Sequence, residues 1–342
     1  MPDRNHAENN VILLAHGDGG RLTHELVTEL FFRHLGNETL VQLTDAAALP
    51  VEEGMIALTT DSFVINPPFF PGGDIGKLAV CGTVNDLAVS GARPRYLTAS
   101  FLIEEGLPVA DLEKIVASMA VACARAGVRV VAGDTKVVAR GQLDRIFINT
   151  TGVGIIPEGV DLGYHRLQPG DRVLVNGTMG DHGMAILAAR EDFGFEHELV
   201  SDCAALDGLA QLLVQGLGDG LRLMRDLTRG GLATAVKEIA VSAGRDIRLE
   251  EEAVPVGRHV RGAAEMLGLD PLYLANEGKL MAVVAGDRVD EALELMRGHE
   301  FGREAAVIGE VHEGMGQVYL RTALGGTKHL DLLAGAPLPR IC

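Results

Sequence analysis

Residues 128–134, Val-Arg-Val-Val-Ala-Gly-Asp, form an apolar run that stops at an aspartate, and this pattern recurs in the first half of the chain. The three runs are residues 40–45, 56–61 and 128–134, which stop at Asp45, Asp61 and Asp134. We expect each run to be a strand with its aspartate at the strand end. A fourth unit, Asn85-Asp86, lies instead in a helical pattern over residues 75–90. The first half is therefore expected to combine strands and helices.

The four aspartates Asp45, Asp61, Asp86 and Asp134 indicate a cation site. A single surface carboxylate is ordinarily only solvated. Several carboxylates brought together repel one another, and hard Mg²⁺ prefers oxygen ligands. We therefore expect these side chains to hold Mg²⁺ that carries ATP, with Asp226, which lies near a glycine turn, as a further metal ligand.

A glycine loop precedes the first helical pattern. The loop reads His16-Gly17-Asp18-Gly19-Gly20, and apolar residues then recur every three to four positions up to residue 36. Backbone N–H groups of such a loop can bind phosphate at a helix N-terminus, although an ordinary turn has the same composition. No Gly-Lys-Ser/Thr follows, so the loop is not a Walker A motif.

Further along the chain, strands and helices are expected to alternate around glycine turns. The expected strands are 97–103, 146–156, 172–176 and 280–284, and the expected helices are 111–127, 184–190 and 232–243. Charged residues accompany glycines in Asp226-Leu227-Thr228-Arg229-Gly230-Gly231 and in Asn276-Glu277-Gly278, where a backbone can approach a ligand closely. Taken singly, each is also compatible with a helix cap or a solvated carboxylate.

Composition limits the possible partners. The 342 residues are 47% hydrophobic, enough for two domains, and we place the boundary near residue 160. A net charge of −17 argues against binding to nucleic acid or to a membrane surface, because such proteins carry clustered Lys and Arg. No apolar stretch reaches the roughly 20 residues that span a bilayer, and residues 1–10 are too polar for a signal peptide. We expect a soluble, cytoplasmic protein.

The chain ends in a thiol. Cys342 follows Pro337-Leu338-Pro339-Arg340-Ile341, and the two prolines favour an extended approach. A terminal cysteine can move between a protein interior and solvent, as a carrier arm does, although many chain ends have no role. The other cysteines, Cys81, Cys123 and Cys203, are too dispersed for a zinc site or a disulfide framework.

Together these motifs resemble the ATP-dependent PurM-like superfamily, which includes aminoimidazole ribonucleotide (AIR) synthetase, selenophosphate synthetase and thiamine monophosphate kinase. The terminal Pro-Arg-Ile-Cys is similar to one family within it, the hydrogenase-maturation carbamoyl dehydratases of the HypE type. The resemblance implies an α/β (α+β) fold with an ATP-binding domain over residues 1–160, which dimerises through its sheet, a second domain over 161–332 and a flexible tail over 333–342.

The resemblance also implies a reaction. A HypF carbamoyltransferase would load Cys342 with a carboxamide, which the chain would dehydrate with ATP to a thiocyanate. The cyanide would then pass to iron on a HypC–HypD scaffold for a [NiFe] hydrogenase. ATP would be bound by Gly17, Gly19 and Gly20 together with the four aspartates. Glu277 is our candidate general base and Lys136 its electrophilic or proton-relay partner.

Two other functions fit parts of the sequence. The chain could be another ATP-dependent PurM-like synthetase or kinase acting on a small molecule, but selenophosphate synthetases carry a reactive residue near the N-terminus and this chain has no cysteine before Cys81. It could also be a non-catalytic scaffold that keeps a nucleotide for stability. The full set of aspartates disfavours the scaffold, and an ATPase assay distinguishes it.

Overall fold

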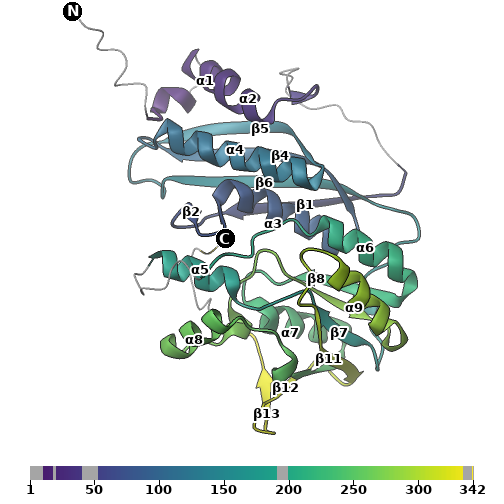
Figure 1. Cartoon of the computed structure of the whole chain (residues 1–342). Coiled ribbons are helices and arrows are strands. Elements are labelled where there is room, and N and C mark those ends of the chain that lie inside the picture. The colour runs from purple at the N-terminus through teal and green to yellow at the C-terminus, as the bar shows by residue number, and fades with distance from the viewer. Residues whose placement is uncertain (1–10, 18–20, 41–52, 191–198, 334–340, 342) are drawn as a thin grey trace, which may run out of the picture.

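The structure, a computed structural model, describes residues 11–17, 21–40, 53–190, 199–333 and 341. A four-stranded sheet belongs to the first half of the chain and a seven-stranded sheet to the second half. In Figure 1 the first half lies above the second, and helix α3 lies where the halves meet. None of the helices in the described ranges is long and apolar enough to cross a bilayer.

The four-stranded sheet has the order β1-β6-β4-β5. Its strands are β1 Met55–Phe63, β4 Arg93–Glu104, β5 Arg129–Val138 and β6 Ile146–Ile156. Strand β6 pairs antiparallel with β1 and β4, whereas β4 and β5 run parallel. Alternate residues of β4 and β6 are buried, because one face of the sheet packs against helices. Strands β1 and β5 are therefore the two edges of this sheet.

Helix α3, Ile75–Val89, is buried on nearly all sides. It contacts β1 and β6 of the sheet and α4 Val109–Ala126. It also contacts α6 Asp207–Leu217 and β8 Leu221–Asp226 of the second half. A helix enclosed in this way needs apolar residues around its whole circumference, as the sequence of α3 provides. The Asp74 carboxylate caps its start by accepting hydrogen bonds from the backbone N–H groups of Gly76 and Lys77, at 2.7 and 3.1 Å.

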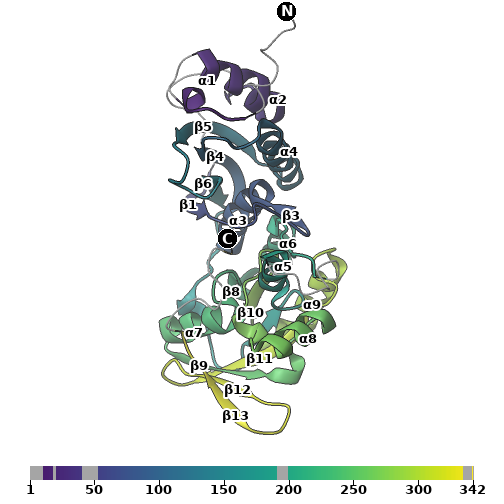
Figure 2. The ribbon, with the colours of Figure 1, turned by 90° about the vertical axis from the view of Figure 1, so that its left-hand side faces the viewer.

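Three short helical segments follow one another at the N-terminal side and cover strand β5 (Figure 2). They are α1 Arg21–Leu26, the π-helical turn η2 Val27–Phe31 and α2 Phe32–Leu35. Their apolar face packs on the sheet, where the rings of Phe31 and Phe101 lie 4.8 Å apart between centroids. The apolar spacing in the sequence therefore correctly predicts a helical region here.

The seven-stranded sheet has the order β13-β12-β9-β11-β7-β10-β8. Its strands are β7 Arg172–Val175, β8 Leu221–Asp226, β9 Arg245–Glu250, β10 Leu280–Val284, β11 Ala306–Glu313, β12 Val318–Arg321 and β13 Thr327–Leu330. The remaining helices are α5 Asp181–Arg190, α7 Gly231–Ala243, α8 Arg258–Leu267 and α9 Val289–Gly298. All five residues of β10 are buried, because the side chains on its two faces belong to two different hydrophobic clusters.

One hydrophobic cluster contains residues of both halves. Ile186, Cys203, Ala275 and Ile341 of the second half belong to the same buried cluster as the side chains around α3 and α4. The Asn85 amide of α3 donates to the carbonyl of Ala204 at 3.0 Å and accepts from the N–H of Leu206 at 2.7 Å. The first sheet ends at Ile156 and the second begins at Arg172. The division into residues 1–160, 161–332 and 333–342 stays a prediction.

Most predicted elements are confirmed, with one correction at the aspartates. Strands β6 and β10 have the predicted bounds, and helix α3 ends within one residue of its prediction. The prediction that Asp61 and Asp134 end their strands is wrong. Strand β1 continues to Phe63 because β6 still pairs with it there. Strand β5 continues to Val138 because the longer strand β4 pairs with it up to that residue. The run that stops at Asp45 lies outside the described residues, apart from Leu40.

Candidate functional site

Three acidic side chains line one cavity at the junction of the halves. Asp61 comes from β1, Asp86 from α3 and Asp226 from the end of β8, and all three line a cavity of about 640 Å³. The Thr59 hydroxyl donates to Asp86 Oδ2 at 2.7 Å. Arg229 lines the same cavity. The structure thus brings together three of the five predicted metal ligands.

These carboxylates repel one another. Burial, followed by the neighbouring Asp86, raises the pKa of Asp61 to about 7. Burial and Asp86 likewise raise the pKa of Asp226 to about 6. Protons therefore compensate part of the negative charge near neutral pH, and a cation would replace them.

The cluster fits a cation that is shared with another ligand. Among the described residues, no three His, Cys, Asp or Glu side chains are grouped so that they could hold a metal ion by themselves. Mg²⁺ usually takes one or two carboxylates and completes its shell with water and substrate phosphates. Asp61, Asp86 and Asp226 therefore fit Mg²⁺ that is held jointly with a polyphosphate.

We predict that Asp61→Asn stabilises the protein more at high pH than at low pH when divalent cations are removed with a chelator. The folded-state pKa of Asp61, about 7, lies above the ordinary 3.8, so the folded protein holds the extra proton between these values. The wild-type protein therefore loses stability as the pH rises through this window, and asparagine removes that loss. The gain in melting temperature should be larger at about pH 8 than at about pH 5.

The exposed Asp287 provides the control for this measurement. Asp287→Asn should shift the melting temperature equally at both pH values. An equal shift in the Asp61 variant would show that the pKa of Asp61 is not raised in the folded protein.

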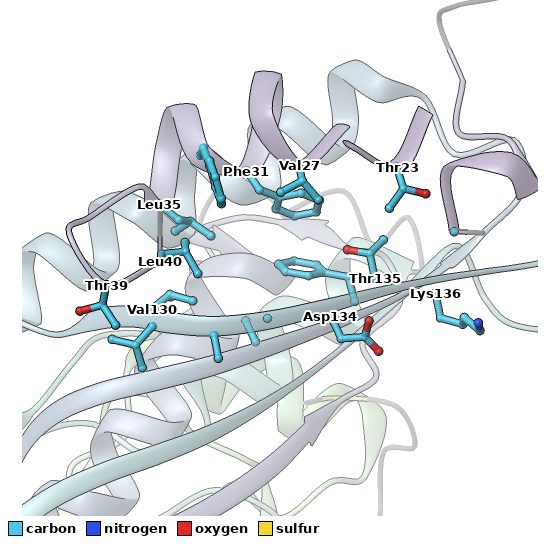
Figure 3. A pocket seen from close by; sticks show the side chains of 17 residues that line it. Thr23, Val27, Phe31, Leu35, Thr39, Leu40, Val130, Asp134, Thr135 and Lys136 are labelled. Carbon is cyan, nitrogen blue, oxygen red and sulfur yellow. The ribbon is translucent and has the colours of Figure 1, made fainter. Parts of the chain in front are cut away.

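A second cavity lies beneath the N-terminal helices and has a volume of about 530 Å³ (Figure 3). Val27, Phe31 and Leu35 face the strands from above, whereas Asp134, Thr135 and Lys136 of β5 give one end of the cavity its polar groups. The cavity is thus apolar along most of its length and charged at one end.

Gly17 also lines this second cavity. A Cβ at Gly17 would lie 2.5 Å from the backbone nitrogen of Val137, so only glycine lets the loop approach β5 so closely. The predicted site residues Gly19, Gly20 and Asp45 lie outside the described residues.

The predicted site residues therefore divide into two groups. Asp134 and Lys136 lie on one edge strand of the four-stranded sheet and Asp61 on the other, with β6 and β4 between them. Three strand spacings separate these edges by roughly 14 Å. Within one subunit, the structure does not place Asp134 and Lys136 beside the acidic cluster at the junction.

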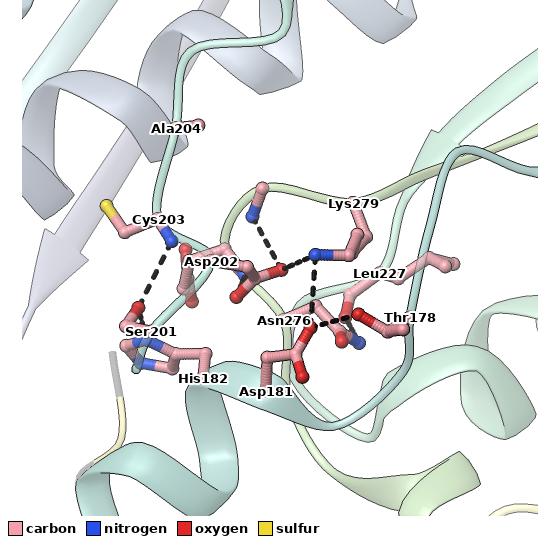
Figure 4. Close-up of polar contacts among 12 residues, drawn as sticks. Thr178, Asp181, His182, Ser201, Asp202, Cys203, Ala204, Leu227, Asn276 and Lys279 are labelled. Atoms are coloured by element: carbon pink, nitrogen blue, oxygen red, sulfur yellow. Dashed lines mark hydrogen bonds and ion pairs between the residues drawn. The ribbon is translucent and has the colours of Figure 1, made fainter. Parts of the chain in front are cut away.

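Glu277 lies in a turn that is hydrogen-bonded to Asp202. Figure 4 shows Asp202 beside Lys279, the residue that ends this turn. The Asp202 carboxylate accepts hydrogen bonds from the N–H groups of Glu277 and Gly278 at 3.1 and 3.2 Å, and pairs with Lys279 Nζ at 3.1 Å. A Cβ at Gly278 would lie 1.9 Å from the Asp202 carbonyl oxygen, so this packing requires glycine. Asp181 also pairs with Lys279 Nζ, at 3.2 Å.

The Glu277 side chain is buried and incompletely bonded. It is 2% exposed, and its Oε1 has no hydrogen-bond partner among the described residues. Burial, followed by the carboxylates of Asp202 and Asp226, raises the pKa of Glu277 well above its usual range. A rigid, buried carboxyl with an unused oxygen is typical of a group that contacts a ligand or exchanges a proton.

Three residues around this turn, His182, Ser201 and Asp202, were not predicted to belong to the site. Asp202 lies 75 residues from Glu277 in the chain, and no sequence pattern links them. His182 lies in a glycine-rich turn before a helix, Gly177-Thr178-Met179-Gly180-Asp181-His182-Gly183. This pattern is the feature of the sequence from which a role of His182 in the site could have been predicted.

Comparisons with known proteins agree over almost the whole chain. Models of the AIR synthase related proteins match residues 43–156 as the N-terminal domain and residues 168–320 as the C-terminal domain. Carbamoyl dehydratase HypE of Bradyrhizobium diazoefficiens is 50% identical over 335 residues, which cover 98% of this chain and 97% of that protein. HypE of Escherichia coli is 49% identical, covering 97% of this chain and 100% of that protein.

Solved structures show the same relationship. The hydrogenase maturation protein HypE in complex with ATP matches with a TM-score of 0.93 and 48% identity, covering 96% of this chain and 99% of that one. HypE in a HypE–HypF complex matches with a TM-score of 0.79 and 50% identity, covering 90% and 99%. The thiamine monophosphate kinase of Aquifex aeolicus, at 21% identity and a TM-score of 0.61, shares the fold. The chain belongs to the carbamoyl dehydratase HypE family of the AIR synthase related proteins.

Proposed function

We propose that this protein uses ATP to dehydrate a carboxamide carried on its own Cys342 to a thiocyanate. The proposal rests on the way in which the penultimate residue is bound. Ile341, the residue before Cys342, is 6% exposed, and its carbonyl accepts a hydrogen bond from His182. Ser201 is hydrogen-bonded to His182, and the next residue, Asp202, is hydrogen-bonded to the Glu277 turn. Ile341 and the buried Glu277 are thus both connected to residues 201–202.

The chemistry requires that the carboxamide oxygen leave as phosphate. The carboxamide oxygen attacks the γ-phosphorus of ATP, the bond to ADP breaks, and one N–H proton is lost. Loss of the second N–H proton then forms the C≡N bond and expels phosphate. The products are the thiocyanate, ADP and phosphate, and the phosphate contains the oxygen that would otherwise have left as water. Both steps need a proton acceptor near the nitrogen, and Glu277 is our candidate.

The two cavities suit the two ends of ATP. The apolar length of the cavity beneath α1 and α2 fits a base, and its polar end, with Gly17, Asp134 and Lys136, fits phosphate. The acidic cluster of Asp61, Asp86 and Asp226 would hold Mg²⁺, which when bound neutralises charge on the phosphates. Lys136 stays a candidate relay residue, and a second subunit would be needed to bring it near the cluster.

A homodimer would supply this second subunit. Met55, Ile56 and Leu58 are 61%, 58% and 69% exposed on β1, an edge strand of the first sheet. Exposed apolar edges favour pairing with another strand. We predict that the protein sediments at about twice its 36.2 kDa mass and that Leu58→Asp sediments as the monomer. Leu324, which is 99% exposed in the second half, provides the control, because Leu324→Asp should remain dimeric. A wild-type protein that is monomeric at micromolar concentration would contradict the dimer.

Partners and location follow from the same proposal. A HypF carbamoyltransferase would load the thiol, in keeping with the HypE–HypF complex of a relative, and a HypC–HypD scaffold would receive the cyanide. Cys81, Cys123 and Cys203 are free thiols, which suits the reducing cytoplasm. No nucleic acid or membrane takes part in the proposed reaction.

Mass spectrometry of the intact protein tests the proposed function. After loading, the wild-type chain should gain one carboxamide, and addition of Mg-ATP should then remove the mass of one water. A loaded chain that keeps its mass while ATP is hydrolysed would contradict dehydration.

A further inference from the structure

Ile341, the penultimate residue, is bound in a buried polar site, which we call the tail seat and define by His182 and Ser201. His182 Nε2 lies 2.6 Å from the carbonyl oxygen of Ile341. The imidazole is fully buried, and the Phe70 ring meets it edge-on at 5.5 Å between centroids. The Ile341 side chain belongs to the hydrophobic cluster that the two halves share. Both the side chain and the carbonyl of the penultimate residue are therefore bound.

The hydrogen bonds of the tail seat fix the tautomer of His182. A carbonyl oxygen can only accept, so Nε2 must carry the proton and donate to Ile341. Nδ1 then accepts from the Ser201 hydroxyl at 2.7 Å, and the Ser201 oxygen in turn accepts from the N–H of Cys203 at 3.1 Å. Burial lowers the pKa of His182, in agreement with a neutral ring that carries one proton. Each donor in this chain of bonds has one acceptor.

The tail seat and the Glu277 turn are linked by hydrogen bonds of neighbouring residues. Asp202 accepts hydrogen bonds from the backbone N–H groups of Glu277 and Gly278. It lies between Ser201 and Cys203 in the segment that Figure 4 shows. The N–H of Ser201 also donates to the carbonyl of Pro71 at 2.9 Å, which ties the segment to the first half. Three hydrogen bonds, from His182 to Ile341, from Ser201 to His182 and from Glu277 to Asp202, therefore connect Ile341 to the Glu277 turn.

We propose that His182 is a positioning residue, which binds the last peptide carbonyl before the terminal cysteine and so holds the loaded thiol for dehydration. The inference rests on the proposed function of Cys342. His182 reaches the tail through Ile341 and takes no part in bond making. Its removal should leave loading intact, because loading needs only an accessible thiol, and should slow the dehydration step.

The first experiment measures access to the Cys342 thiol without ATP or partner proteins. Wild-type protein and the variants His182→Phe and His182→Gln are treated with iodoacetamide, and alkylation of Cys342 is followed by peptide mass spectrometry. His182→Phe cannot donate to Ile341 and should be alkylated faster by on the order of tenfold, the effect of one net hydrogen bond. His182→Gln, whose amide N–H can reach the same carbonyl, should restore much of the protection.

The second experiment separates loading from dehydration. In His182→Phe, loading with carboxamide should proceed at the wild-type rate or faster, whereas the rate constant of water loss after ATP addition should fall by on the order of tenfold. Melting curves establish that each variant is folded. If His182→Phe does not fold, Ser201→Ala replaces it, since it removes the donor to Nδ1, and it should also increase alkylation of Cys342.

The outcomes distinguish the tail seat from the proposed function. Unchanged alkylation of Cys342 in the folded His182→Phe or Ser201→Ala protein would overturn the role of His182, even if thiocyanate still forms. Faster alkylation in a protein whose wild type forms no thiocyanate would support the tail seat and contradict the proposed function.

Discussion

Replacing Cys342 with alanine is expected to abolish both carboxamide loading and thiocyanate formation while leaving the fold and ATP binding intact. The carboxamide needs a sulfur nucleophile at the chain end, and alanine provides none. A terminal side chain contributes little to packing, so the melting temperature should change little. Intact mass after incubation with a carbamoyltransferase should show no carboxamide on the variant. This is the largest effect that we predict.

The remaining described cysteines cannot replace Cys342. Cys81, Cys123 and Cys203 are 2%, 6% and 3% exposed. Burial raises the pKa of Cys123 to about 12, which suppresses the reactive thiolate. Cys123→Ala is therefore the matched control and should load normally. Deletion of residues 341–342 should likewise abolish loading, but it should also lower the melting temperature, because Ile341 belongs to the hydrophobic cluster that the two halves share. Residues appended after Cys342 should keep the thiol but impair dehydration. Gain of the carboxamide mass by Cys342→Ala would contradict the carrier role.

Glu277→Gln is expected to accept the carboxamide normally and then to accumulate it. Loading precedes the proton removal that we assign to Glu277, so only the ATP-dependent step should slow, by about 10²–10⁴-fold. The substitution keeps the size of the side chain, and the backbone bonds to Asp202 do not depend on the carboxylate. Because burial raises the pKa of Glu277, the ionised fraction and hence the wild-type dehydration rate should increase with pH.

The exposed Glu265 of α8 supplies the control, because Glu265→Gln makes the same chemical change at a solvent-exposed position. It should dehydrate the carboxamide at the wild-type rate. Dehydration by Glu277→Gln at the wild-type rate, measured by the loss of one water from the loaded chain, would exclude Glu277 as the proton acceptor.

Local patterns predicted the elements that depend on local chemistry. Strand β10 is buried on both faces and reads as a continuous apolar run, and α3 is apolar around its circumference, so both were found. The strand ends at Asp61 and Asp134 were misplaced because strand length is set by the pairing partner. Strand β4 pairs with β5 as far as Glu104 and Val138, and this is not visible in β5 itself.

The sequence allowed the type of site to be predicted, but not the relative positions of its residues. Apolar runs that stop at aspartates, together with glycine turns, indicated a cation and phosphate site, and Asp61, Asp86 and Asp226 do line one cavity. The separation of Asp134 from them depends on the strand order β1-β6-β4-β5, which the sequence does not state. The bond between His182 and Ile341 joins residues 159 positions apart. Such contacts are fixed by the packing of the two halves and not by local sequence.

The central claim, that ATP removes the carboxamide oxygen as phosphate, is tested most directly by following that oxygen. Protein loaded with a carboxamide that carries a heavy-oxygen label is mixed with Mg-ATP, and the released phosphate is analysed by mass spectrometry. The account predicts one labelled oxygen in each phosphate, formed together with the thiocyanate. Label that appears in water, with unlabelled phosphate, would contradict it.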